Sequence, residues 1–280
     1  MFLDRLNKTI RKRNSLLCVG LDTDIEHIPP LLLSELDPLF LFNREIIEAT
    51  REFVSAYKLN MAFYESLGIA GWELLEKTLS VIPDDVFVIA DAKRGDIENT
   101  SRKYAETFFK TYSFDSITVS PFMGFDSVEP FLEHKDKGIF ILCLTSNSGA
   151  QDFQNLKVEG EALYLKIARK VVEWNFNFGN CGLVVGGTQL QQIEEIRNVA
   201  SNLPFLVPGI GAQGGNLEQA IKCATDDNGQ SALINASRSI LYAGSEMNFA
   251  EKARQRAKHL RDQINMLVRI YKNPDLLEKN

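Results

Sequence analysis

The chain has 280 residues, of which 45% are hydrophobic and 24% are charged, and its formal net charge is −6. This length can bury a large core, and a mean hydropathy of −0.12 is typical of a globular protein in water. The acidic balance argues against a nucleic-acid-binding surface, but it does not exclude a local site for an anionic ligand.

The first residues of the chain contain an early acid, Asp4, and no long apolar core, so they do not predict a secretory signal. Leu3, Leu6 and Ile10 instead indicate an amphipathic helix over about residues 2–13. No apolar run approaches the length of a transmembrane helix, so we expect no membrane association.

The cysteines give no sign of a metal site or of a disulfide framework. Cys18, Cys143, Cys181 and Cys223 are widely separated, and the histidines also lie far apart. The spacing of a zinc site is therefore missing from the sequence. We expect no bound metal, and reduced structural thiols in a cytoplasmic protein.

Short apolar runs follow one another along the chain, separated mostly by stretches of helical character. They cover residues 15–21, 54–59, 86–90, 116–120, 139–144, 182–185, 205–208 and 232–235. Continuous apolar runs are typical of parallel strands that are covered on both faces. A further amphipathic pattern predicts a C-terminal helix over about residues 249–271.

This alternation of strands and helices is typical of either a (β/α)8 barrel or a doubly wound sheet. Eight units in 280 residues favour the (β/α)8 TIM barrel, as a single domain over residues 1–280. The segment 146–161 is rich in Asn, Gln, Gly and Ser, and we interpret it as a long active-site loop rather than a domain boundary.

The most informative segment is Asp91-Ala92-Lys93-Arg94-Gly95-Asp96-Ile97, which directly follows the third apolar run. Alternation along a strand places Asp91 and Lys93 on one face, and a turn at Gly95 brings Asp96 near them. Two carboxylates around one ammonium at the end of a buried strand are costly unless they have a use. A strand-end salt bridge and a catalytic site are both open interpretations of this segment alone.

In a TIM barrel, reactive side chains project from the C-terminal ends of the strands. Polar and charged residues stand at nearly all of these ends, which a merely structural barrel would not need. In chain order they are Asp22, Lys58, Asp91, Lys93, Asp96, Ser120, Ser146, Gln213 and Arg238. We therefore expect an active site at this rim.

A glycine-rich segment, Pro208-Gly209-Ile210-Gly211-Ala212-Gln213-Gly214-Gly215, follows the seventh run. A dinucleotide-binding motif would lie near a first strand and be followed by an acid at the end of the second strand, and neither holds here. The loops after strands 7 and 8 of a TIM barrel commonly bind phosphate. Glycine amides, a helix N-terminus, Gln213 and the Arg238 guanidinium are suitable donors, so we predict a phosphate site.

Together, these residues resemble the orotidine 5'-monophosphate decarboxylase family. The resemblance runs from Leu17-Cys18-Val19-Gly20-Leu21-Asp22 to Arg238, and its most specific motif is D-x-K-x-x-D, here Asp91, Lys93 and Asp96. The length of the chain and the stretch 60–65 resemble the divergent bacterial branch of the family. The resemblance implies a homodimer of TIM barrels without a cofactor. It also implies decarboxylation of orotidine 5'-monophosphate to uridine 5'-monophosphate, the last step of pyrimidine nucleotide synthesis.

The resemblance also implies a role for individual residues. Lys58, Asp91, Lys93 and the partner subunit's Asp96 would form an alternating charged tetrad, in which Lys93 stabilises the developing charge and delivers a proton. The expected substrate-binding residues are Asp22 and Lys58 for the ribose, with Ile97 and Thr100 of the partner subunit, Ser146 for the pyrimidine, and Pro208, Gln213, Arg238 and the backbone of Ser237 around the phosphate. The family often has glycine where Ser237 stands, which matters little if only the amide is used.

Two other functions are compatible with parts of this pattern. A magnesium-dependent sugar-phosphate decarboxylase or aldolase of the same barrel group shares the D-x-K-x-x-D motif. Such enzymes have a carboxylate metal ligand at the end of strand 2, where this chain has Lys58, which would repel the metal. A non-catalytic phosphate-binding barrel would gain nothing from a charged tetrad.

Overall fold

A computed structural model of the chain describes residues 2–187, 190–210 and 216–272. Eight parallel strands close into a barrel in the order β1-β10-β9-β8-β5-β4-β3-β2. They are β1 Leu17–Gly20, β2 Ala56–Asn60, β3 Phe87–Arg94, β4 Ser116–Val119, β5 Gly138–Leu144, β8 Cys181–Val185, β9 Phe205–Val207 and β10 Ala232–Ala236. Each of the predicted apolar runs overlaps one of these strands, and five strands extend beyond the predicted bounds, most of all β3, which continues to Arg94; the TIM barrel is confirmed.

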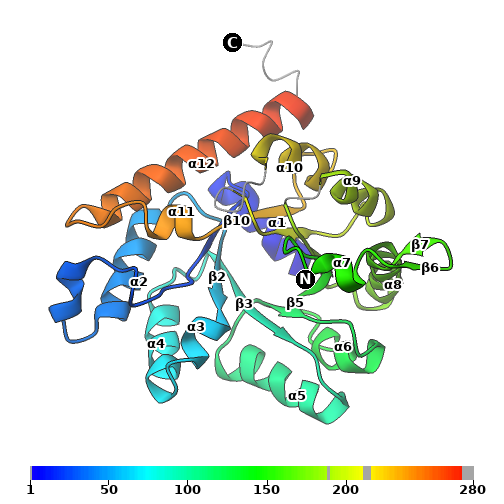
Figure 1. Cartoon of the computed structure of the whole chain (residues 1–280), viewed down its shortest axis with the longest axis horizontal. Helices are drawn as coiled ribbons and strands as arrows, with labels where there is room; N and C mark the ends of the chain where they lie inside the picture. Colours follow the sequence, from blue (N-terminus) through cyan, green and yellow to red (C-terminus); the bar gives the residue numbers. More distant parts are fainter. Residues whose placement is uncertain (1, 188–189, 211–215, 273–280) are drawn as a thin grey trace.

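Helices surround the barrel, except that the N-terminal helix lies across one of its ends (Figure 1). They are α1 Phe2–Arg13, α2 Pro38–Thr50, α3 Met61–Glu65, α4 Ile69–Ser80, α5 Glu98–Glu106, α6 Phe125–Leu132, α7 Ala150–Phe153, α8 Leu163–Phe178, α9 Leu190–Val199, α10 Leu217–Ala224, α11 Arg238–Leu241 and α12 Phe249–Lys272. A short 3-10 helix covers Pro30–Ser34, and a π-helical turn, Thr107–Thr111, ends α5. The long α12 packs against α2 and α10.

The N-terminal helix α1 closes the end of the barrel opposite the strand C-termini. Phe2 is fully buried, with its ring centroid 5.8 Å from that of Phe87 at the start of β3 and 6.0 Å from that of Phe140 in β5. A Cβ atom at Gly138 would lie 2.1 Å from the Phe2 ring, so only glycine fits there. The apolar face of α1 thereby seals this end of the barrel and leaves its other end for the site.

The segment 146–161 is not irregular throughout. It contains α7 and ends in a two-stranded hairpin, β6 Lys157–Val158 with β7 Glu161–Ala162, which turns at Gly160 with φ +86°. A hydrogen bond of 2.8 Å from Leu163 N to Leu156 O joins the residues on either side of the hairpin, just after α7. The polar composition of the segment reflects these tight turns.

All four cysteines are free, and burial raises the pKa of Cys18 to about 12, so that thiol stays neutral. Within the described ranges, the chain has no helix of the length and apolar character that crossing a membrane requires.

Candidate active site

Three charged side chains meet at the C-terminal end of the barrel. Lys58 near the end of β2 lies between two acids, with its Nζ 2.8 Å from Asp91 Oδ2 and 3.7 Å from Asp22 Oδ1. The strands bring them together because β2 pairs with both β1 and β3, and Gly20 is opposite Lys58. Parallel strands end at the same rim, so residues far apart in sequence become neighbours.

Burial makes this cluster electrostatically strong. Lys58 is only 3% exposed and Asp91 9% exposed. Burial opposes the charge of Lys58, but the carboxylates of Asp22 and Asp91 outweigh it and raise the pKa of Lys58. Burial likewise opposes ionisation of Asp91, but the ammonium groups of Lys58 and Lys93 hold the pKa of Asp91 well below its usual range. Both groups are therefore charged at neutral pH.

Lys93 reaches the same carboxylate, but by a route that differs from the prediction. Its Nζ lies 2.5 Å from Asp91 Oδ1. Strand alternation does not produce this contact, because Lys93 has φ +48° and the register of β3 against β4 shifts between Ala90 and Arg94. A bulge at the end of β3 places the lysine, and its side chain stays 48% exposed toward the barrel mouth.

A cavity of about 170 Å³ opens beside this cluster. It is lined by Asp22, Lys58, Asn60, Asp91, Pro208, Gly209, Ile210, Asn235, Ser237 and Arg238. Six of these were predicted as site residues, and they come from the ends of five different strands or the loops that follow. The cavity thus joins the charged cluster to the described part of the predicted phosphate loops.

The far side of the cavity is built by residues that follow β9 and β10. Gly209 has φ +93°, a backbone conformation that favours glycine. A Cβ atom at Gly20 would lie 1.9 Å from Ser237 Oγ, so a larger residue in β1 would displace the Ser237 side chain at the start of α11. Arg238 is exposed at the rim. Gln213, the other predicted phosphate ligand, lies outside the described residues.

Two acceptor oxygens on residues of the cavity wall lack a hydrogen-bond partner among the described residues. Asp22 Oδ1 and Asn235 Oδ1 are buried, and neither accepts a hydrogen bond from another described residue. Buried polar atoms normally have hydrogen-bond partners, so these two oxygens are candidates to accept a hydrogen bond from a hydroxyl or amide group of a bound molecule.

Five predicted residues in the described ranges do not line this cavity: Lys93, whose ammonium contacts the cavity residue Asp91, and also Asp96, Ile97, Thr100 and Ser146. Asp96 turns its Oδ1 to the amide of Ile97, which donates at 2.7 Å, and its carboxylate makes no ion pair with any residue in the described ranges. Ile97 is 64% exposed and Thr100 is also exposed, at the start of α5. Ser146 follows β5 and is half-buried. Within one chain, these residues lie on the rim outside the cavity.

Sequence reasoning missed two residues of the cavity wall, Asn60 and Asn235. Asn60 is the last residue of β2, opposite Asp91, and its Oδ1 accepts a hydrogen bond of 3.3 Å from Ala62 N. Asn235 belongs to β10 and is 7% exposed. Both are short polar residues at the end of an apolar run, and this position at a strand end is the sequence feature that could have predicted them as site residues.

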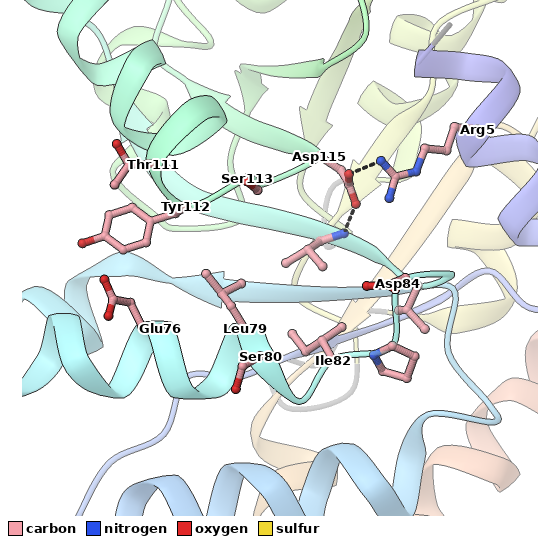
Figure 2. Close-up of a pocket in the computed structure, with 13 residues that line it drawn as sticks. Arg5, Glu76, Leu79, Ser80, Ile82, Asp84, Thr111, Tyr112, Ser113 and Asp115 are labelled. Atoms are coloured by element: carbon pink, nitrogen blue, oxygen red, sulfur yellow. Dashed lines mark hydrogen bonds and ion pairs between the residues drawn. The ribbon is translucent and has the colours of Figure 1, made fainter.

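A larger cavity, of about 520 Å³, lies at the opposite end of β3 (Figure 2). Its wall includes Asp115, which accepts a hydrogen bond of 2.9 Å from Val88 N and forms an ion pair with Arg5 of α1. Burial raises the pKa of Asp115. Because this is the N-terminal end of the strands, we assign the contacts a structural role in holding α1 to the barrel.

Fold and site define an enzyme of the TIM-barrel class with a charged pocket at the C-terminal ends of its strands. Residues 15–253 match the family described as Orotidine 5'-phosphate decarboxylase / HUMPS, and the chain belongs to this family. Orotidine 5'-phosphate decarboxylase from Dehalococcoides mccartyi is 52% identical over 268 residues, which are 94% of this chain and 97% of that protein. The chain is accordingly a carboxy-lyase.

Solved structures agree with this relationship. OMP decarboxylase from Leishmania donovani has a TM-score of 0.83 and 38% identity, covering 95% of this chain and 98% of its own. UMP synthase from the same organism has a TM-score of 0.86 and 40% identity over 95% of this chain. The match spans 56% of that longer chain.

Proposed function

We propose that the chain converts orotidine 5'-monophosphate (OMP) into uridine 5'-monophosphate (UMP) and carbon dioxide, the last step of pyrimidine nucleotide synthesis. The observation that carries this proposal is the row of alternating charges Lys58, Asp91 and Lys93 at the mouth of the barrel, with 2.8 Å and 2.5 Å between neighbours. The reaction is placed in the cytoplasm, in keeping with the free thiols of the chain.

Lys93 is the proton donor. Breaking the bond between C6 of the pyrimidine and its carboxylate leaves the electron pair on C6, in an orbital that the ring delocalises poorly. The Lys93 ammonium stabilises this charge and then transfers one proton to C6, while carbon dioxide departs. The half-exposed side chain of Lys93 supports this role, because its ammonium can reach a bound ligand while Asp91 holds it.

The remaining residues bind the substrate away from C6. Arg238, the amide of Ser237 and Gln213 hold the phosphate, and Pro208 lies beside it. Asp22 and Lys58 bind the ribose hydroxyls, and Asp22 Oδ1, which accepts no hydrogen bond from a described residue, is a suitable acceptor. Ser146 contacts the pyrimidine. Phosphate contacts far from C6 can then contribute to catalysis by holding the substrate in place and excluding water.

The active enzyme is a homodimer with shared sites. Asp96 makes no ion pair with the lysines of its own chain within the described residues, which leaves its carboxylate available to a second copy. Ile97, which follows β3, is 64% exposed, and Ile69 after β2 and Phe122 and Met123 after β4 are 81%, 82% and 47% exposed. Exposed apolar side chains that follow three adjacent strands are compatible with a protein interface. In the dimer, Asp96, Ile97 and Thr100 of the partner subunit complete each site.

A magnesium-dependent reaction of the same barrel group is less well supported. The Lys58 ammonium stands between Asp22 and Asp91, at 3.7 Å and 2.8 Å, where a divalent cation would need to bind two carboxylates. A positive charge in that position repels a second cation.

An absorbance assay tests the proposed function. The purified chain is mixed with OMP in excess chelator, and the ultraviolet spectrum should change from that of OMP to that of UMP at a rate proportional to the protein concentration. No change with OMP, or a change that needs added magnesium, would overturn the proposal.

A further inference from the structure

The bulge that places Lys93 has a single partner on the neighbouring strand. Ala90 pairs with Ile117 and Arg94 pairs with Val119, so Asp91, Ala92 and Lys93 all lie opposite Thr118. Within this stretch β3 cannot continue a regular ladder with β4. The buried polar groups of the bulge therefore need partners other than strand carbonyls.

Thr118 supplies such partners through its hydroxyl group. Its Oγ1 accepts a hydrogen bond of 2.9 Å from Lys93 N and donates one of 3.0 Å to Asp91 Oδ1. A backbone amide can only donate and an ionised carboxylate can only accept, so the hydroxyl has one orientation. Thr118 is 1% exposed, so water cannot readily replace it.

The Thr118 hydroxyl connects the backbone of Lys93 to the carboxylate of Asp91, whose relative positions determine where the Lys93 ammonium lies. It fixes the backbone of Lys93 in its left-handed conformation, φ +48°, which is unusual for a residue other than glycine. It also holds the same carboxylate oxygen, Asp91 Oδ1, that receives the Lys93 ammonium. Loss of the Thr118 hydroxyl would free both the backbone of Lys93 and the carboxylate of Asp91, the two groups that define the ion pair.

We propose that Thr118 is a positioning residue, which sets the place of the Lys93 ammonium through the bulge of β3 and the carboxylate of Asp91. It touches neither substrate nor reacting atoms. The proposal rests on the proposed function for its catalytic consequence, while the placement of Lys93 can be measured without any substrate.

Thr118→Val removes the hydroxyl with little change of shape. We expect kcat for OMP to fall about 10- to 100-fold, because a small misplacement of a catalytic group is costly, while KM changes less than about threefold. Thr118→Ser keeps the hydroxyl and should stay within about threefold of wild type in kcat. If Thr118→Val does not fold, Thr118→Ala tests the same loss.

Thr50→Val is the matched control. Thr50 is also fully buried, and its Oγ1 contacts Ile46 O and Tyr57 Oη, each at 2.7 Å, away from the site. Its substitution should lower the melting temperature but leave kcat within about threefold of wild type. A loss of kcat in Thr50→Val equal to that in Thr118→Val would overturn the assignment.

A second measurement needs no substrate. The rate at which an amine-reactive reagent labels Lys93, followed by mass spectrometry of the peptide, should rise severalfold in Thr118→Val and remain unchanged in Thr118→Ser and Thr50→Val. Absence of wild-type activity on OMP would contradict the proposed function alone. Unchanged kcat in an active Thr118→Val protein, or unchanged labelling of Lys93, would overturn the role of Thr118.

Discussion

Lys58 and Asp91 form a buried ion pair at the mouth of the barrel, with 2.8 Å between Lys58 Nζ and Asp91 Oδ2. Their side chains are 4% and 11% exposed. Such a pair contributes little when complete, because burial costs each charge its hydration, but removing one partner leaves the other charge buried and unpaired. The site is therefore sensitive to the loss of either residue.

Lys58→Met should lower the free energy of unfolding by about 3 kcal/mol near pH 7, measured by urea denaturation. The carboxylates of Asp22 and Asp91 would lose their shared ammonium. Lys77→Met is the control, because Lys77 forms an exposed pair with Asp37 at 2.7 Å and should leave the urea midpoint nearly unchanged.

The stability of Lys58→Met relative to wild type should also depend on pH. The pKa of Asp91 is lowered in the folded protein, so its contribution to stability is complete above the ordinary value near 4 and is lost as the pH falls. The stability difference between wild type and Lys58→Met should therefore shrink below about pH 4. A difference that is constant down to about pH 3 would contradict the coupling of these charges.

Lys93→Ala should reduce kcat by more than about a thousandfold, because it removes both the charge that stabilises C6 and the transferred proton. The protein should remain folded, since the Lys93 side chain is 48% exposed. Lys103→Ala, at an exposed pair with Glu106, is the control and should be fully active. Substantial turnover by Lys93→Ala would exclude Lys93 as the donor.

Arg238→Ala should raise KM for OMP about 10- to 100-fold, since a charge-assisted contact to phosphate is lost. The weak reaction of orotidine, which has no phosphate, should change much less. Steady-state kinetics with both compounds give the comparison, with Arg44→Ala as the control, since Arg44 is an exposed residue of α2 that does not line the cavity. Equal losses for the two substrates would show that Arg238 does not bind the phosphate.

Mixing two inactive variants tests the shared site. Lys93→Ala and Asp96→Ala homodimers should each be nearly inactive. After they are unfolded and refolded together, about half of the dimers are mixed, and one site of each mixed dimer is intact, so roughly a quarter of wild-type activity should return. If Asp96 serves its own chain, no combination restores a site. Mass spectrometry of the native dimers verifies the exchange, and an inactive exchanged mixture would rule out sharing.

The strands of the barrel and much of the site could be predicted from local patterns. Apolar runs mark the strands because both faces of a parallel sheet are covered, and Asp22, Lys58 and Asp91 follow from their places at strand ends. The meeting of Asp91 and Lys93 was predicted for the wrong reason. It depends on a bulge, and a bulge depends on the register with β4, which no local pattern contains.

Other residues of the site were not predicted from the sequence, for related reasons. Asn60, Asn235 and Thr118 are short polar residues in or beside apolar strands, where most such residues have no function, and only their tertiary contacts distinguish them. Asp96 ends the motif and Ile97 follows it, yet in one chain both lie outside the cavity. Their role depends on a second subunit, so it stays a prediction.

The most direct test of the proposed chemistry follows the proton to C6. OMP is incubated with the protein in D2O containing excess chelator, and the product is examined by proton NMR. We predict UMP that carries deuterium at C6, with the H6 signal missing and the H5 signal reduced to a singlet, and no product with Lys93→Ala. Absence of UMP with the wild-type protein, a requirement for added magnesium, or deuterated UMP formed equally well by Lys93→Ala would contradict the account.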